Sequence, residues 1–155
     1  MSQRTSLRLG ESLQKAGLIT PLQLAEVLEI QKVDRRKIGE IIVEKGFATE
    51  RQICEALSRM YALPFVDLKK VYVKEDVFAA VDVDLIRRYQ VFPIKLEGKV
   101  LTLAINNPLE FSVIQEIQYA TGFQVNPVLS TLSDIDEKLS QCYEAMQSAH
   151  NLQAT

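Results

Sequence analysis

The chain has 155 residues, of which 47% are hydrophobic and 25% charged, and its net charge is −2. This composition is typical of a globular protein with one ordinary domain or two small ones. The small net charge excludes a broad electrostatic attraction to DNA, RNA or acidic membranes. No run of about 18 apolar residues is present, and the first residues lack the apolar core of a signal peptide. We therefore expect a cytoplasmic protein that binds no nucleic acid and does not insert into a membrane.

A 24-residue unit occurs twice near the start of the chain, with an offset of 29 residues. Residues 8–31 are RLGESLQKAGLITPLQLAEVLEIQ, residues 37–60 are KIGEIIVEKGFATERQICEALSRM, and a five-residue spacer, KVDRR, separates them. Matched positions include both glycines, the threonine and the spaced apolar residues of each unit. This density of matches indicates a structural repeat.

Each unit carries the signals of two helices joined by a tight turn. Gly17 stands where a left-handed C-terminal cap is needed, a conformation that glycine adopts at little cost. Thr20 and Gln23 fit a capping box, and Pro21 fits the first position of the next helix. The second unit repeats the glycine and the capping box. Residues 1–61 are therefore predicted to form four short helices in two pseudo-equivalent hairpins.

The remainder of the chain alternates between helical and extended patterns. Residues 62–149 are predicted to form a small α/β subdomain with a short sheet, and residues 150–155 a frayed tail. The expected order is an extended segment at 63–68, helices at 74–80 and 84–90, a hairpin at 91–105, a helix ending before Gly122, a strand at 123–129 and a last helix after a cap region at 130–133. The predicted fold class is α+β, a four-helix tandem repeat followed by this α/β part.

Residues that commonly carry catalysis are scarce. His150 is the only histidine, and Cys54 and Cys142 are far apart without metal-ligand spacing, so we expect two reduced thiols and no metal site. Gly98 and Lys99 lack the other residues of a P-loop. The aspartates at 82 and 84 are predicted to cap a helix rather than form a catalytic pair. We expect no enzymatic activity and no cofactor, but binding or regulation.

The tandem unit resembles the MshEN-type domain, the N-terminal module of type II secretion and type IV pilus assembly ATPases. That family has the same pattern, Arg-Leu-Gly, an apolar pair, Gly, spaced leucines and a closing Gln, twice over 24 residues with a five-residue spacer. LPFVDL, VFPI, NNPLEF and TGFQVNPVL in the second half are also similar to the family. The ATPase core of the family is absent from these 155 residues, so we expect either an excised regulatory domain or a stand-alone relative.

The resemblance implies that the chain binds cyclic di-GMP, a dinucleotide with two equivalent halves, and that residues 1–61 are the ligand-binding subdomain. Arginine offers a planar fork to guanine O6 and N7, an amide side chain can pair with remaining polar edges, and glycine allows the backbone to approach the ligand. Leucines at helical spacing would form an apolar bed for base and ribose. The ligand-binding residues that it implies are Arg8, Leu9, Gly10, Leu13, Gly17, Leu24, Leu28, Gln31, Lys37, Ile38, Gly39, Ile42, Gly46, Ile53 and Leu57.

The second unit departs from the family pattern at three positions. Lys37 replaces the arginine, Ile38 replaces the leucine and Met60 replaces the closing glutamine. Lysine keeps the charge but loses the planar fork, and methionine cannot donate a hydrogen bond. Arg35 or Arg36 of the spacer could substitute for the missing fork, or both could simply be solvated.

Three functions therefore remain open. The first is a cyclic di-GMP receptor that regulates an assembly ATPase, whose partners would be the ATPase core or a membrane-platform subunit. The second is a docking module that links the ATPase to the cytoplasmic part of its membrane platform without a nucleotide. The third is a purely structural repeat, which exposed apolar surface around Leu24 and Leu28 would count against.

Overall fold

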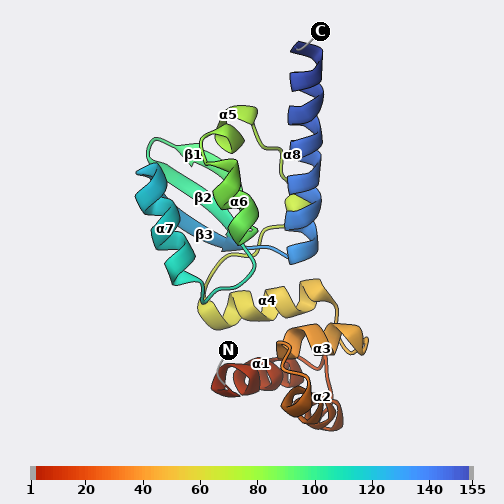
Figure 1. Cartoon of the computed structure of the whole chain (residues 1–155). Coiled ribbons are helices and arrows are strands. Elements are labelled where there is room, and N and C mark those ends of the chain that lie inside the picture. The colour runs from red at the N-terminus through yellow and green to blue at the C-terminus, as the bar shows by residue number, and fades with distance from the viewer. Residues whose placement is uncertain (1–2, 154–155) are drawn as a thin grey trace. The chain divides into compact units, whose positions relative to one another are not determined.

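The computed structural model describes residues 3–153, and the side chains of residues 8–145. It divides into two compact units, Met1–Ala62 and Leu63–Thr155, and each is described by itself. The described residues contain helices and one three-stranded sheet, which confirms the predicted α+β class (Figure 1).

Four helices form the first unit, as the sequence predicted. They are α1 (Gln3–Lys15), α2 (Pro21–Val33), α3 (Ile38–Glu44) and α4 (Glu50–Tyr61). Both capping boxes are present: Thr20 Oγ1 accepts from Gln23 N at 3.1 Å, and Thr49 Oγ1 accepts from Gln52 N at the same distance. Each glutamine side chain accepts in return from the amide of its threonine. The turns after α1 and α3 pass through glycines with φ of +75° and +77°, as expected for left-handed caps.

The four helices pack with the pattern of a two-fold axis. Helix α1 contacts α4 and α3 contacts α2, while within each hairpin α1 contacts α2 and α3 contacts α4. Exchanging the two units maps this set of contacts onto itself. This is the set of contacts that a pseudo-two-fold rotation between the two hairpins of residues 8–31 and 37–60 produces.

Gly10 allows the two helices of the first hairpin to come close together. A Cβ atom on Gly10 would lie 2.4 Å from Leu24 Cδ1, so a larger residue would displace that side chain. The equivalent Cβ on Gly39 would lie 3.1 Å from Cγ2 of Ile53, the residue that matches Leu24. The same close contact is thus built twice, with less room in the first unit.

Helices surround the sheet in the second compact unit, Leu63–Thr155. Its strands are β1 (Phe92–Glu97), β2 (Val100–Ile105) and β3 (Gln124–Leu129), and its helical segments are η1 (Leu68–Lys70), α5 (Glu75–Ala79), α6 (Val83–Tyr89), α7 (Phe111–Thr121) and α8 (Leu132–Gln153). Strand β2 is central, antiparallel to β1 and parallel to β3. Residues 101–105 of β2 are all buried, so helices cover both faces of the sheet, with α7 and α8 on opposite sides (Figure 1).

Three details differ from the sequence-based expectation. The segment 63–68 forms only one isolated parallel bridge, Phe65 to Leu129, before η1 begins. Asp82 caps α6 by accepting from Asp84 N at 2.9 Å, whereas Asp84 itself lies in the first turn. Helix α8 continues through Gln153, so the predicted frayed tail is helical up to that residue, and residues 154–155 lie outside the described part.

The outer edge of β3 offers no open backbone donor at its three outward positions. Gln124 N and Ser130 N bond toward β2, so the odd-numbered residues between them point their amides outward. Val125 N donates to Gln118 Oε1 at 3.0 Å, Pro127 has no N–H, and Leu129 N donates to Pro64 O at 2.8 Å. This arrangement protects the edge against pairing with another chain.

We predict that Gln118→Ala exposes this edge. The amide of Val125 loses its acceptor, so the free energy of unfolding should fall by about 1 kcal/mol, and self-association should increase. Urea denaturation and sedimentation velocity measure the two effects. Gln115→Ala on the exposed face of α7 is the control. A Gln118→Ala protein as stable and monomeric as the control would contradict this account of the edge.

We also predict that Gly10→Val destabilises the first unit. Overpacking against Leu24 should cost about 1–3 kcal/mol, which urea denaturation measures. Ala25→Val, at an exposed position of α2, shows the cost of valine where no side chain is crowded and should cost only about 0.5 kcal/mol, whereas helix propensity alone would favour valine over glycine at position 10. Equal costs for the two variants would show that the close approach at Gly10 is not needed.

Candidate functional site

The two basic residues that open the repeat units occupy different backbone environments. Arg8 lies within α1, which begins at Gln3, whereas Lys37 is the residue directly before α3. Both side chains are exposed. They are therefore available to a ligand, but helix geometry presents them differently despite their matching positions in the repeat.

The apolar residues predicted to form a ligand bed are mostly core residues. They share an exposed fraction of 9% or less; these are Leu9, Leu13, Leu24, Ile38, Ile42, Ile53 and Leu57. Leu28 is half-buried. Their burial between the helices accounts for the repeated pattern, and contact of these residues with a ligand stays a prediction.

Gly10 and Gly39 differ in their helical positions, and their contact with a ligand stays a prediction. Gly10 is buried in the middle of α1, where an amide donates to the carbonyl four residues earlier and is not open to a ligand. Gly39 lies in the first turn of α3, where amides lack such a partner. The glycines at 17 and 46 are exposed and end their helices, so their conformation has a structural cause.

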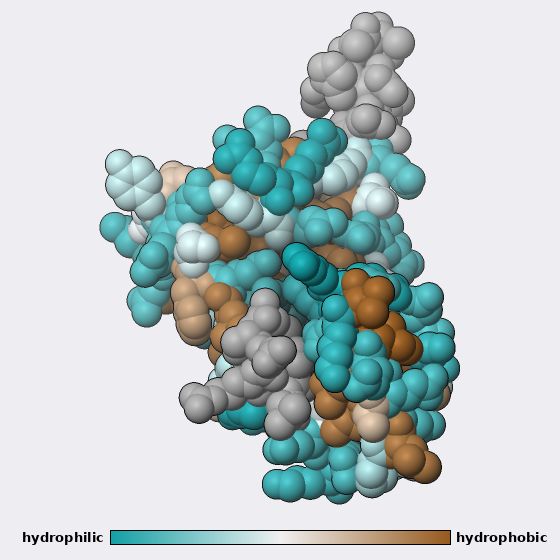
Figure 2. Space-filling model, turned by 60° about the horizontal axis from the view of Figure 1, so that its bottom comes forward, coloured by the Kyte–Doolittle hydropathy of each residue, from teal (hydrophilic) through white to brown (hydrophobic). Residues whose placement is uncertain are grey.

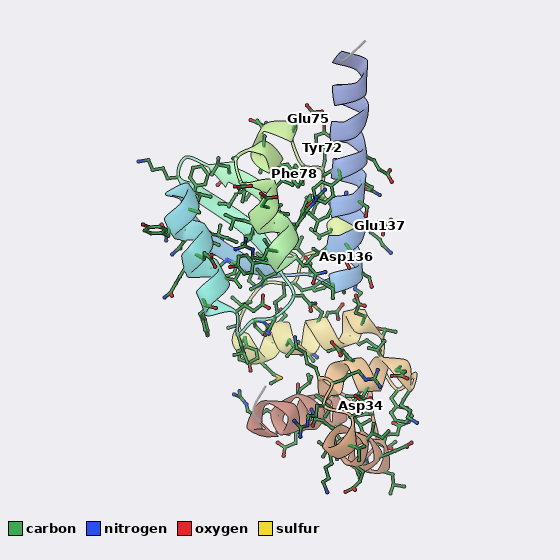
Figure 3. All side chains as sticks on the ribbon, in the orientation of Figure 1. Asp34, Tyr72, Glu75, Phe78, Asp136 and Glu137 are labelled. Atoms are coloured by element: carbon green, nitrogen blue, oxygen red, sulfur yellow. The ribbon has the colours of Figure 1, made fainter. Side chains whose placement is uncertain are left out.

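A network of polar contacts surrounds the spacer between the units. Arg36 Nε donates to Asp34 Oδ2 at 2.8 Å, and Arg36 Nη1 forms an ion pair with Glu44 Oε2. Gln31 Nε2 donates to the carbonyl of Arg36 at 3.4 Å. We call these residues together with Lys37 the spacer cluster. Asp34, after the end of α2, is labelled in Figure 3.

Within the spacer cluster, Asp34 and Arg36 each have a pKa shifted toward the charged form. The hydrogen bond from Arg36 holds the pKa of the Asp34 carboxyl below its usual value. Asp34 and Glu44 in turn raise the pKa of the Arg36 guanidinium. The sequence suggested Arg35 or Arg36 as a substitute for the missing planar fork, or two solvated residues of the spacer. The ion pair with Glu44 was missed, because nothing in the local pattern signals a contact across eight residues.

Apolar side chains are also exposed on α2. Leu22 is 83% exposed and Val33 is 88% exposed, and a spacing of 11 residues places them on one face of the helix. Their equivalents in the second unit are Arg51 and Ala62. Figure 2 shows, on one face of the molecule, brown hydrophobic surface among teal hydrophilic residues. This face distinguishes the first hairpin from the second.

The compact unit Leu63–Thr155 has a polar hollow of about 250 Å³ between η1 and α8. Its lining includes Lys69 and Asp134, whose charged groups lie 3.9 Å apart. Among the described residues, no three His, Cys, Asp or Glu side chains gather where they could hold a metal ion. Within that same part of the chain, every helix is too short or too polar to cross a membrane.

Comparison with known proteins identifies type IV pilus assembly ATPases as relatives. The chain is 27% identical over 136 residues to PilB of Myxococcus xanthus, an alignment that covers 88% of this chain and 24% of the relative. It is 29% identical over 138 residues to PilB of Thermus thermophilus, covering 88% of this chain and 16% of the relative. The chain thus spans a quarter or less of the length of these curated relatives.

Two solved structures share the fold. The structure of MshE with cyclic di-GMP (cdg) has a TM-score of 0.76, 23% identity and coverage of 87% of this chain and 98% of that one. The N-terminal domain of XpsE has a TM-score of 0.68, 19% identity and coverage of 90% and 97%. The family model of the MshEN domain matches residues 61–149, which is more than half of the chain. The chain therefore belongs to the MshEN domain family.

Proposed function

We propose that this chain is a regulatory domain that binds cyclic di-GMP through its tandem helical repeat. The domain would act on an ATPase of a type IV pilus or type II secretion system, with the ATPase core or a membrane-platform subunit as its protein partner. It would do so in the cytoplasm and without catalysis of its own. The MshE structure with cyclic di-GMP supports the choice of ligand, because that protein has the same fold.

The pseudo-two-fold packing of the first unit is the observation that carries this proposal. Cyclic di-GMP consists of two identical halves related by a two-fold axis. A site made of two equivalent hairpins can meet both halves with the same residue types, as in any isologous contact. The closed set of contacts, α1 with α4 and α2 with α3, provides a scaffold with that symmetry.

Arg8, Gln31 and Lys37 would make the polar contacts of this site. Arg8 is exposed and would offer its planar fork to guanine or phosphate, and Lys37 would supply a charge in the second unit. Gln31 is half-buried beside the spacer, near Lys37 in sequence. The second repeat, residues 37–60, is expected to bind its half of the ligand more weakly, since Lys37 lacks the planar fork and Met60 lacks a donor.

The exposed apolar face of α2 favours a second candidate function, docking to a protein partner without a nucleotide. Leu22 and Val33 are almost fully exposed on one face of α2, where they offer apolar contact area to a partner protein. Under this alternative, loss of Arg8 would leave the function intact, whereas Leu22→Ser would weaken it.

Isothermal titration calorimetry with cyclic di-GMP tests the first proposal, with GTP and cyclic di-AMP as ligand controls. We expect selective binding of one ligand per chain, and Arg8→Ala should weaken it by about 1–3 kcal/mol if it removes a bidentate contact. Arg59→Ala, an exposed arginine of α4 outside the proposed site residues, should leave the affinity unchanged. No heat and no thermal shift with any of the ligands would reject nucleotide sensing and favour the docking alternative.

A gain of affinity should accompany restoration of the second unit. Lys37→Arg returns the planar fork, and Met60→Gln returns an amide donor at the position that matches Gln31. Each change should tighten binding of cyclic di-GMP by about 1 kcal/mol or more. If both variants bind no better than the parent chain, the second unit does not contact the ligand through these positions.

A further inference from the structure

Arg36 is held by two carboxylates at the side of the residues proposed to bind the ligand. Its Nε and Nη2 atoms each lie 2.8 Å from Asp34 Oδ2, and its Nη1 atom pairs with Glu44. Its own carbonyl accepts from Gln31, and Lys37 follows it in the chain. Arg36 is thus adjacent to Gln31 and Lys37, two of the residues proposed to contact the ligand.

The donors that Arg36 gives to these carboxylates are the ones that an anionic ligand would need. A guanidinium binds carboxylate and phosphate with the same forked geometry, so one partner excludes the other at each donor pair. The side chain of Arg36 is 41% exposed, which leaves it accessible from solvent. Exposed ion pairs contribute little net free energy, so exchanging a carboxylate for a ligand phosphate costs little.

We infer that Arg36 is the arginine of the second half-site, held in reserve by Asp34 and Glu44. Binding of the dinucleotide transfers the guanidinium from the carboxylates to a phosphate or guanine of the ligand. The two carboxylates are therefore autoinhibitory: they compete with the ligand for Arg36. This inference rests on the proposed function, because it concerns the same ligand and the same site.

The position of Arg36 fits this role better than that of its neighbour. Arg35 is also exposed, but it makes no ion pair with the described residues and no contact to Gln31. Lys37 lacks the fork that the first unit has at Arg8. An arginine one residue before Lys37 restores a fork to the second unit, and its contact with Gln31 keeps it beside the ligand residues.

The sign of the Glu44→Gln effect tests the inference. If Glu44 competes with the ligand, Glu44→Gln should tighten binding of cyclic di-GMP by about two- to fivefold, the size expected for an exposed ion pair. If Glu44 merely helps Arg36 to hold the spacer in place, the same variant should weaken binding. Asp34→Asn is the second variant, and it should tighten binding in the same direction. Circular dichroism of each variant verifies that the helices are retained.

Three comparisons separate this exchange from a general change of charge. Glu40→Gln removes the same charge from α3 and should change the affinity by less than about twofold, since Glu40 is exposed to solvent. Arg36→Ala should weaken binding about five- to tenfold, whereas Arg35→Ala should not. In the Arg36→Ala background, Glu44→Gln should bring no gain, because the effect of Glu44 acts through Arg36.

The outcomes distinguish the inference from the function on which it rests. If the parent chain binds cyclic di-GMP and Glu44→Gln binds equally or more weakly, the inference is overturned and the receptor function stands. If Glu44→Gln tightens binding equally with or without Arg36, the Glu44 charge repels the ligand directly rather than competing for Arg36, and the inference is overturned. If neither the parent chain nor any variant binds, both fail. Binding that appears only after Glu44→Gln would support both.

Discussion

The close contact between the helices of each hairpin constrains the whole first unit. At Gly10 and Gly39 the absence of a side chain lets α1 approach α2 and α3 approach α4. The facing residues, Leu24 and Ile53, are thereby drawn into the core. With the hairpins held this tightly, the remaining apolar faces meet crosswise, α1 with α4 and α2 with α3. The symmetry that matches a two-fold ligand therefore depends on two small residues that need not touch the ligand.

Features set by neighbouring residues could be predicted from the sequence, and features set by distant contacts could not. The capping box of Thr20 and Gln23 involves atoms three residues apart, so its signature is local. The choice of partner for α1 is a contact across the repeat, and the hydrophobic pattern alone does not specify it. The same limit applies at Gly10: the motif does not reveal that its amide lies inside a helix, because α1 begins at Gln3, before the motif does.

In the compact unit Leu63–Thr155, the main constraint is the edge of a small sheet, whose backbone amides need partners. The outward amides of β3 are accounted for in three ways. Gln118 accepts from Val125 N, Pro127 has no N–H, and the extended segment at Pro64 accepts from Leu129 N. Only the proline is visible in the sequence as an edge signal. The role of Gln118 depends on how α7 crosses back over the sheet, which residue types do not reveal. The unit that matches the family model is thus the one whose local sequence explains least about its packing.

The pseudo-two-fold packing of the hairpins also bears on how such a domain could have arisen. Neither hairpin can bury its core alone, since each first helix lies against the second helix of the other hairpin. Two separate copies of one hairpin would form this arrangement as a homodimer, the commonest symmetric assembly. Fusion of the two copies through a five-residue spacer would preserve the fold and release each half from the obligation to remain identical. Lys37, Met60 and the charged spacer are changes of this kind: after fusion, a substitution can occur in one hairpin without occurring in the other.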